Sequence, residues 1–353
     1  MATMKLPRYR TGDAALDDEV AALVEKVSDP ADTDLIFELV ASALRLATDA
    51  ADRGDLKIAN AALKEMRHAF HVFAPYRSSR KVAIFGSART QPEDPLYVLT
   101  RELAAAMAAL DWMVVTGAGP GIMEAGIEGA GAENAFGVSI QLPFETTTSQ
   151  FIADDPKLIN FRYFFTRKLE FIKESDGFVL LPGGYGTLDE TFELLTLLQT
   201  GKAQPAPVVL LDVPGGTYWQ HWGRFVTDEL ERAGYVSPQD QHLYCVTDSI
   251  RTAVDEILGF YVNYHSQRFV KGRLVLRMRT VPDAAELAEI NRDFADIVTR
   301  GQIDEIPATP EEIADDDHVE LARLALRFDR HAWARLRMLI DRLNGIDTRA
   351  RGS

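Results

Sequence analysis

The hydrophobic pattern of the chain changes character near residue 80. From about Ala14 to Phe73, apolar residues recur at helical spacing, and Ala, Glu, Lys and Arg are frequent between them. Leu35, Ile36, Leu39 and Val40 show this spacing most clearly. The pattern predicts a helical N-terminal extension over residues 1–79, which ends in a short linker.

From residue 80 to residue 265, short apolar runs alternate with amphipathic segments. The predicted strands are residues 82–85, 112–116, 135–141, 177–181, 208–212 and 243–246. The predicted helices are residues 97–110, 122–132, 161–175, 188–199, 218–233 and 249–264. Continuous β-branched runs are typical of parallel strands that are buried on both faces. Their alternation with helices predicts a doubly wound, Rossmann-like, mostly parallel α/β sheet.

The pattern after residue 265 is weaker. Residues 268–278 predict one more strand or a hairpin, residues 284–300 an acidic helix, and residues 319–343 a basic helix. We therefore expect residues 266–353 to form a mixed, mainly helical C-terminal extension.

Composition and charge narrow the possible functions. The 353 residues are 46% hydrophobic and 26% charged, which is typical of a globular protein. A net charge of −15 argues against binding to nucleic acid or to an anionic membrane. The single cysteine, Cys245, excludes a disulfide within the chain. No apolar run is long enough for a membrane span, and the N-terminus lacks a signal-like apolar stretch, so we expect a cytoplasmic protein.

One glycine-rich run carries the clearest chemical signal. Residues 182–187 read Pro-Gly-Gly-Tyr-Gly-Thr, between a predicted strand and a predicted helix. Such a turn directs backbone N–H groups and the positive end of a helix dipole at one small volume, which suits a phosphate. Glu190 adds a carboxylate one turn into the helix. The alternative is that Thr187 and Glu190 only form a capping box.

Two further glycine loops follow the first and second predicted strands, at residues 86–89 and 117–121. The second loop does not match the dinucleotide fingerprint, because Ile122 occupies the third glycine position, and the chain has no Gly-Lys-Ser/Thr phosphate loop. Each loop alone is equally typical of a tight turn. Three such loops on one sheet edge, where the strand order reverses, favour a site for one phosphate and one sugar.

These motifs together resemble the LONELY GUY (LOG) family. Residues 182–190 match PGGxGTxxE, and the resemblance also rests on Arg167-Lys168 and on residues 117–124. It covers about residues 81–255. The family contains cytokinin riboside 5′-monophosphate phosphoribohydrolases and related nucleoside-monophosphate nucleosidases, which were long labelled lysine decarboxylases. A pyridoxal decarboxylase is not favoured, because no loop pattern supplies a Schiff-base lysine with an acidic partner.

The resemblance implies hydrolysis of the N-glycosidic bond of a nucleoside 5′-monophosphate, AMP or a cytokinin ribotide, to free base and ribose 5-phosphate. The alternative is a non-catalytic nucleotide-binding protein or a molybdenum-cofactor carrier. The loop at residues 117–124 and Asp189 both depart from the plant-type pattern, which leaves the base specificity open. The resemblance also implies a homodimer. We expect a small-molecule partner rather than nucleic acid or membrane, and neither metal nor cofactor.

The resemblance assigns catalytic roles to Arg167 and Glu190. A carboxylate near the ribose stabilises the positive charge that develops there as the glycosidic bond breaks. Without the resemblance, Arg167 reads as a surface partner of Glu170 or Glu174 at helical spacing. The implied substrate contacts, of which Glu145 has the least support, are Gly86, Ser87, Gly119, Gly121, Met123, Glu145, Lys168, Gly183, Gly184, Tyr185, Gly186, Thr187 and Thr196.

Overall fold

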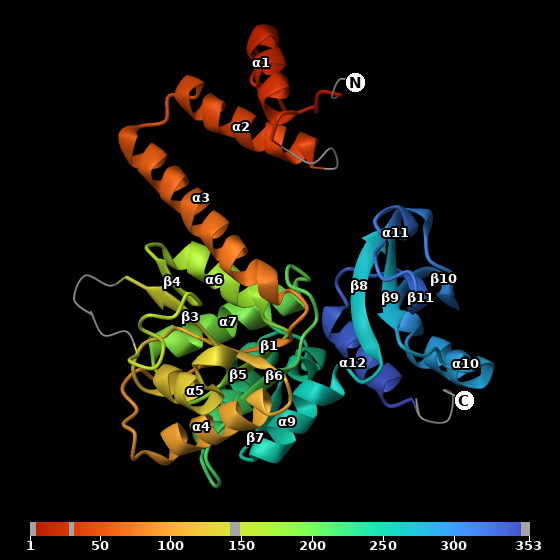
Figure 1. Cartoon of the computed structure of the whole chain (residues 1–353). Helices are drawn as coiled ribbons and strands as arrows, with labels where there is room; N and C mark the ends of the chain where they lie inside the picture. Colours follow the sequence, from red (N-terminus) through yellow and green to blue (C-terminus); the bar gives the residue numbers. More distant parts are fainter. Residues whose placement is uncertain (1–4, 28–31, 142–148, 347–353) are drawn as a thin grey trace. The chain divides into compact units, whose positions relative to one another are not determined.

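The computed structural model describes residues 5–27, 32–141 and 149–346 (Figure 1). It separates into two compact units, residues 1–67 and residues 68–353. The three-part division at residues 79 and 265 stays a prediction.

The first unit is helical. It contains α1 (Ala14–Val24), α2 (Thr33–Thr48) and most of α3 (Arg53–Phe73), which continues into the second unit. The Asp13 side chain caps α1 by accepting hydrogen bonds from the backbone amides of Ala15 and Leu16. A small core forms between α1 and α2, from Val20, Ala21, Val24, Phe37 and Ala41.

The second unit is built on a seven-stranded parallel sheet with the strand order β4-β3-β2-β1-β5-β6-β7. Its strands are β1 (Lys81–Phe85), β2 (Met113–Thr116), β3 (Ala135–Ile140), β4 (Leu158–Phe161), β5 (Gly177–Leu180), β6 (Val208–Leu211) and β7 (Cys245–Thr247). The predicted doubly wound parallel sheet is confirmed. The sequence pattern missed β4, so the helix that it placed at residues 161–175 begins only after this strand.

Helices cover both faces of the sheet (Figure 1). On β1, Val82 and Ile84 pack into one core with α4, α5 and α9, whereas Ala83 and Phe85 pack into the other with α6, α7 and α8. The helices are α4 (Pro95–Ala108), α5 (Ile122–Ala130), α6 (Phe164–Glu174), α7 (Tyr185–Gln199), α8 (Tyr218–Phe225) and α9 (Ile250–Gly259). Single turns and short helices complete the unit: η1 (Ala74–Tyr76), η2 (Ala132–Asn134), η3 (Val226–Glu231) and η4 (Pro238–Leu243).

The strand order reverses beside β1. Strands β1 to β4 run outward in one direction, and β5 to β7 run outward in the other, so β1 lies between β2 and β5. In open parallel sheets the carboxyl ends of the strands at such a point form the ligand site. The loops that leave β1, β2 and β5 there are the three glycine loops of the sequence.

A second, antiparallel sheet follows, with the order β10-β11-β9-β8. Its elements are β8 (Tyr264–Val270), β9 (Arg273–Met278), α10 (Ala284–Asp293), η5 (Ala295–Ile297), β10 (Val298–Glu305), α11 (Pro310–Ala314), β11 (Ala322–Phe328) and α12 (Trp333–Asn344). The expected hairpin is present as β8 and β9. Lys271 and Gly272, with φ of 47° and 80°, form its two-residue turn.

The helix predicted over residues 319–343 is wrong in its first half. Residues 322–328 are β11, a central strand that pairs with both β9 and β10. The acidic helix predicted to residue 300 likewise ends at Asp293, and β10 follows. Tertiary pairing overrides the local preference here, because the one buried charge of β11, Arg323, has the buried partner Glu312.

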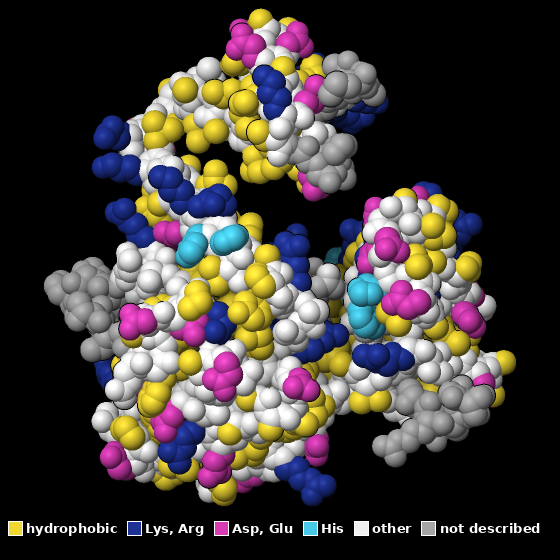
Figure 2. All heavy atoms as spheres, in the orientation of Figure 1, with side chains coloured by type: hydrophobic (Ala, Val, Ile, Leu, Met, Phe, Trp, Pro, Cys, Tyr) yellow, Lys and Arg dark blue, Asp and Glu magenta, His cyan; other side chains and the backbone are white. Residues whose placement is uncertain are grey.

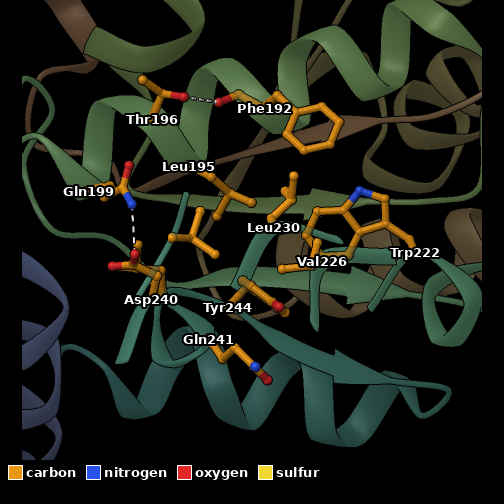
Figure 3. Close-up of a pocket in the computed structure, with 12 residues that line it drawn as sticks. Phe192, Leu195, Thr196, Gln199, Trp222, Val226, Leu230, Asp240, Gln241 and Tyr244 are labelled. Atoms are coloured by element: carbon orange, nitrogen blue, oxygen red, sulfur yellow. Dashed lines mark hydrogen bonds between the residues drawn. The ribbon is translucent and has the colours of Figure 1, made fainter. Parts of the chain in front are cut away.

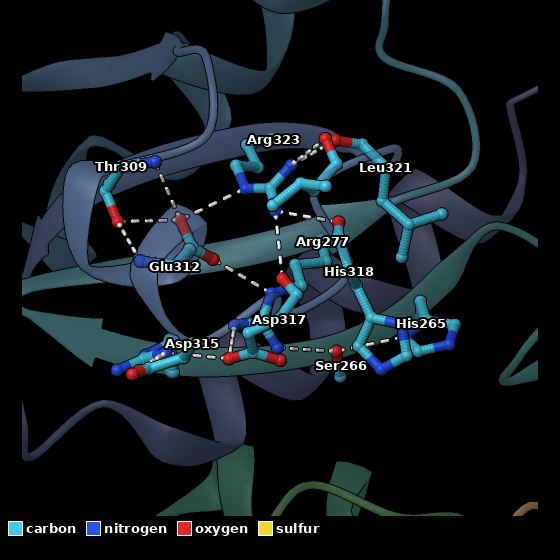
Figure 4. A network of polar contacts seen from close by, with 12 residues as sticks. His265, Ser266, Arg277, Thr309, Glu312, Asp315, Asp317, His318, Leu321 and Arg323 are labelled. Carbon is cyan, nitrogen blue, oxygen red and sulfur yellow. Dashed lines mark hydrogen bonds and ion pairs between the residues drawn. The ribbon is translucent and has the colours of Figure 1, made fainter. Parts of the chain in front are cut away.

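Arg323 and Glu312 belong to a polar network between the second sheet and α11 (Figure 4). Glu312 is fully buried and accepts hydrogen bonds from Arg277 Nε at 2.9 Å and Arg323 Nε at 3.1 Å. Burial alone would raise the pKa of Glu312, but hydrogen bonds from Thr309 and Arg277 outweigh it and lower that pKa to about 2. Asp317 is paired with Arg268 at 2.7 Å and with Arg277, so this stretch of the acidic loop is held by ion pairs.

The last helix connects the second sheet to the first. Gly201, just beyond the end of α7, has φ of 66°, and a Cβ built on it would lie 1.9 Å from the Trp333 indole. Arg337 of α12 forms an ion pair with Glu256 of α9 and stacks over Phe260 at 4.8 Å. The end of α7 and the face of α12 are therefore in close contact.

The buried carboxyl of Glu170 on α6 should make the free energy of unfolding depend on pH. Glu170 is fully buried, and neither of its oxygens has a hydrogen-bond partner among the described residues. Burial raises the pKa of Glu170 to about 7. The folded state therefore holds this proton up to a higher pH than the unfolded state, so this group makes stability fall as pH rises from 4.5 through 7.

We expect Glu170→Gln to remove this loss. Between pH 5.5 and pH 8 the wild-type free energy of unfolding should fall by about 2 kcal/mol more than that of the variant, measured by urea unfolding. Glu102→Gln, an exposed glutamate on α4, is the control and should track the wild type. Parallel pH curves for Glu170→Gln and wild type would contradict the prediction.

Within the part of the chain that the structure describes, no helix combines the length and the apolar character needed to cross a bilayer.

Candidate functional site

A cleft of about 880 Å³ opens at the carboxyl ends of β1 and β5. Its walls come from the loops after β1, β2 and β5, the first turns of α6 and α7, and the start of α8. The loops are tied together by backbone hydrogen bonds, from Ser87 N to Pro182 O at 3.3 Å and from Ile122 N to Ser87 O at 3.1 Å. The cleft therefore has a preformed rim at the point where the strand order reverses.

The floor of the cleft includes the N-terminus of α7. This helix begins at Tyr185, its cap is Gly184, and no side chain caps it. The first backbone N–H groups of a helix have no partner within the helix and carry a partial positive charge, so they make a candidate anion site. A Cβ on Gly183 would lie 2.0 Å from Thr187 Oγ1, which requires glycine at this position.

Glu190 lines the cleft one turn further along α7. Because α7 starts at Tyr185 with no side-chain cap, the Thr187 and Glu190 capping box is not formed. The Glu190 side chain is only 11% exposed. Burial raises the pKa of Glu190 to about 7, although Lys168 and Arg167 act in the opposite direction. A carboxyl with such a pKa exchanges a proton near neutral pH.

Arg167 reaches the same cleft from α6. Its guanidinium lies 5.3 Å from the ring centre of Phe171 and beside Gly117, where an added Cβ would be 2.8 Å from Nη2. Burial lowers the pKa of Arg167, and the charge of Glu190 opposes this. Ion pairs with Glu170 or Glu174 do not occur among the described residues, so Arg167 is not the surface partner that helical spacing alone suggests.

Lys168 lies behind the cleft rather than in its wall. Its ammonium group is 2.8 Å from Asp189 Oδ2, 2.5 Å from Glu193 Oε2 and 3.8 Å from Glu190 Oε2. It therefore links α6 to three acidic side chains of α7 and holds Glu190 from one side.

Most of the predicted site residues meet in the cleft. Its walls include Gly86, Ser87, Met123, Arg167, Gly183, Gly184, Tyr185, Gly186, Thr187 and Glu190. Gly119 and Gly121 shape the second loop without lining the cleft: Gly119 packs beneath Met123, and Gly121, with φ of 70°, lies against the Ser87 carbonyl. Glu145 lies outside the described residues.

Thr196 lies elsewhere. Its hydroxyl donates to the Phe192 carbonyl at 2.7 Å, and the residue lines a separate apolar pocket of about 80 Å³ between α7, η3 and η4 (Figure 3). Leu195, Trp222 and Tyr244 contribute to the same pocket. A contact between Thr196 and a ligand in the cleft stays a prediction.

The sequence did not single out several residues of the cleft wall. Arg89 is within the first glycine loop and adds a second guanidinium, and Phe164 precedes Arg167 by one helical turn, so both had a local signal. Tyr218 had none, because it comes from α8, more than thirty residues after the PGG motif.

Tyr218 fixes the direction of one peptide group in the anion site. Its hydroxyl donates to the Gly183 carbonyl at 2.7 Å, while its own amide donates to Asp212 Oδ2 at 3.1 Å. In a planar trans peptide the N–H points away from the C=O of the same group. The hydroxyl therefore orients the Gly184 N–H.

We expect Tyr218→Phe to weaken the binding of a phosphorylated ligand about fivefold, since one hydrogen bond contributes about 1 kcal/mol. Calorimetric titration of the full chain with AMP would measure this. Tyr235→Phe removes an exposed hydroxyl outside the cleft and should leave the Kd unchanged. Equal affinity of Tyr218→Phe and wild type would show that the hydroxyl does not position the loop.

The fold and the cleft define a Rossmann-like domain with an anion site at its topological switch point. Residues 118–257 match a family model described as "Possible lysine decarboxylase". The chain is 37% identical over 101 residues to the probable cytokinin riboside 5′-monophosphate phosphoribohydrolase LOGL3 of Oryza sativa subsp. japonica, covering 29% of this chain and 46% of that protein. It is 39% identical over 101 residues to the cytokinin riboside 5′-monophosphate phosphoribohydrolase LOG1 of Arabidopsis thaliana, with coverages of 29% and 45%.

The family-model match falls within the α/β domain, and the chain is therefore similar to proteins of the LOG family. The chain spans less than half the length of these two curated relatives. Among solved structures, it is similar to the molybdenum cofactor carrier protein of Chlamydomonas reinhardtii, with 22% identity, a TM-score of 0.35 and coverages of 51% and 98%. The molybdenum cofactor binding protein of Rippkaea orientalis gives 17% identity, a TM-score of 0.37 and coverages of 50% and 94%.

Proposed function

We propose that this protein hydrolyses the N-glycosidic bond of nucleoside 5′-monophosphates, AMP or cytokinin ribotides, and releases free base and ribose 5-phosphate. The observation that carries the proposal is the position of Glu190, a buried carboxyl one helical turn from the uncapped N-terminus of α7. A phosphate bound at that N-terminus leaves the ribose within reach of the carboxylate.

Each group at the cleft has a role in this reaction. The amides of Gly184 to Thr187 bind the 5′-phosphate. Ionised Glu190 stabilises the positive charge on the ribose as the bond breaks and orients the attacking water. Arg167 binds the substrate and favours the ionised form of Glu190.

The lining of the cleft supports hydrolysis over pyridoxal-dependent decarboxylation. The decarboxylase reaction requires a lysine that forms a Schiff base. The described residues that line the cleft include no lysine, and Lys168 is engaged with Asp189 and Glu193.

A panel of monophosphates tests the proposal. Full-length protein is incubated with AMP, the other common nucleoside monophosphates and an N6-prenylated AMP, and released bases are separated by chromatography. We expect base from at least one adenine nucleotide. Tight binding of AMP without turnover would instead favour a nucleotide-binding or carrier protein.

We also propose a homodimer that forms through α6 and α7. Phe165 and Leu169 of α6 are 55% and 45% exposed. Phe192 of α7, which lines the pocket of Figure 3, is 38% exposed. Such an apolar face is typical of a subunit interface. Sedimentation of Phe165→Glu at half the wild-type mass would support it.

A cytoplasmic location completes the proposal, because the proposed substrate is an intracellular nucleotide.

A further inference from the structure

The N-terminal unit, residues 1–67, leaves much of its apolar surface in contact with solvent. Its core between α1 and α2 has only five buried residues, of which Phe37 is the one aromatic. Eight large aliphatic side chains of the unit remain exposed, namely Leu23, Val27, Leu35, Leu39, Leu44, Leu56, Ile58 and Leu63. Exposed apolar surface on this scale marks an interaction site.

On α3 two exposed leucines and two half-buried residues form an apolar stripe. Leu56, Ala59, Leu63 and Met66 follow one another at spacings of three, four and three, which is the spacing of a helix–helix seam. Leu56 and Leu63 are 41% and 48% exposed. We call these four residues the α3 stripe. Because this spacing is that of a helix–helix seam, we expect the partner to be a helix.

One flank of the α3 stripe is basic. At 100° per residue, Arg53, Lys57, Lys64 and Arg67 fall on the same side of the stripe. None of the four has an ion-pair partner among the described residues. Figure 2 shows basic side chains gathered along α3. A partner helix with an acidic flank fits this surface.

A helix of that kind is present in the same unit. On α2, Leu35, Leu39, Ser42 and Leu46 face one side, opposite Phe37, and we call them the α2 stripe. Leu35 and Leu39 are 59% and 52% exposed. Asp34, Glu38 and Asp49 lie on one flank with Arg45, which pairs with Asp49 at 4.0 Å, so this flank is negative on balance. Each stripe spans about 15 Å, so the two match in length as well as in charge.

We propose that the α3 stripe binds the α2 stripe of a second copy of this chain. Leu56 and Leu63 of the α3 stripe and Leu35 and Leu39 of the α2 stripe are exposed in one copy, so these leucines do not cover each other within it. Two copies bury both at once: α2 of each copy packs on α3 of the other, in a twofold, self-complementary contact. The acidic flank of α2 then faces the basic flank of α3, which fixes the direction of the pairing. The contact uses no residue of the cleft or of the α6 and α7 face.

Cysteine cross-linking between full-length chains tests the pairing. In a Cys245→Ser background, one chain carries Leu39→Cys and a second, with a different tag, carries Leu63→Cys. After mixing and mild oxidation, we expect a covalent product that contains both tags. Leu110→Cys, at an exposed leucine outside both stripes, replaces Leu39→Cys in the control and should give no such product.

Charge reversal provides a second test. An unfolded variant would also lose the cross-link, but a compensating charge reversal on the other chain would not restore it. Adding Lys57→Glu and Lys64→Glu to the Leu63→Cys chain should lower the yield about tenfold. Adding Asp34→Lys and Glu38→Lys to the Leu39→Cys chain should then restore it.

Three outcomes would overturn the proposal. The first is no product with both tags. The second is a monomeric, internally cross-linked product from a chain with both cysteines, which would mean that the chain covers its own stripe. The third is a yield that does not respond to charge reversal. Base release from AMP, measured on the same variants, should be unchanged, which separates this proposal from the proposed function.

Discussion

Glu190→Gln is expected to reduce base release from AMP by a factor of about 10² to 10⁴, with AMP binding retained. Glutamine keeps the size of the side chain but cannot carry the negative charge that stabilises the developing positive charge on the ribose. Single-turnover assays would measure the rate, and calorimetric titration would measure the AMP affinity.

Glu193→Gln is the matched control, because Glu193 also pairs with Lys168 but does not line the cleft. It should retain most of the activity. The pH profile gives an independent readout. Since burial raises the pKa of Glu190 to about 7, the wild-type kcat/KM should fall about tenfold for each pH unit below 7. A Glu190→Gln variant with wild-type turnover would remove Glu190 from the mechanism.

Gly117→Ala is expected to lower kcat/KM by about 10- to 100-fold without unfolding the protein. An added Cβ would lie 2.8 Å from Arg167 Nη2 and 2.5 Å from Met123 Sδ, so the guanidinium must shift. A displacement of about 1 Å in a positioned catalytic group costs as much as 10²-fold in rate. Steady-state assays with the monophosphate that turns over fastest would measure the change.

Gly119→Ala separates the two contacts. Its Cβ would meet only Met123, at 2.7 Å from Cε, and a flexible methionine can move. We expect less than a threefold loss for this variant. Equal losses in the two variants would mean that Met123, and not Arg167, carries the effect.

The main sheet was predictable because its signals are local. Buried parallel strands are apolar throughout, as in Val208–Leu211, and helices lie between them. The missed strand β4 is short, follows a polar stretch and is only partly buried, so no apolar run marks it. For β11 the cause is different: Arg323 is a buried charge whose partner, Glu312, is supplied by a separate helix. Sequence periodicity does not reveal such a pairing.

Some residues of the candidate site were likewise predictable from local sequence, and others were not. Residues within the glycine loops, such as Ser87 and Gly183, could be identified because a turn and a helix start require particular residue types. Tyr218 could not, since only the folded sheet brings α8 next to the loop after β5. The charge state of Glu190 also depends on its burial, which the residue type does not encode.

Helix α7 extends from the cleft to the C-terminal helix α12. Its 15 residues span about 22 Å, with the uncapped backbone amides of the cleft at one end and the Trp333 indole against Gly201 just beyond the other end. Because the indole leaves no room for a Cβ at Gly201, the segment after α7 packs tightly against the first residue of α12. We therefore expect substitutions of Trp333 to affect the position of the α7 amides from a distance, since Trp333 does not line the cleft.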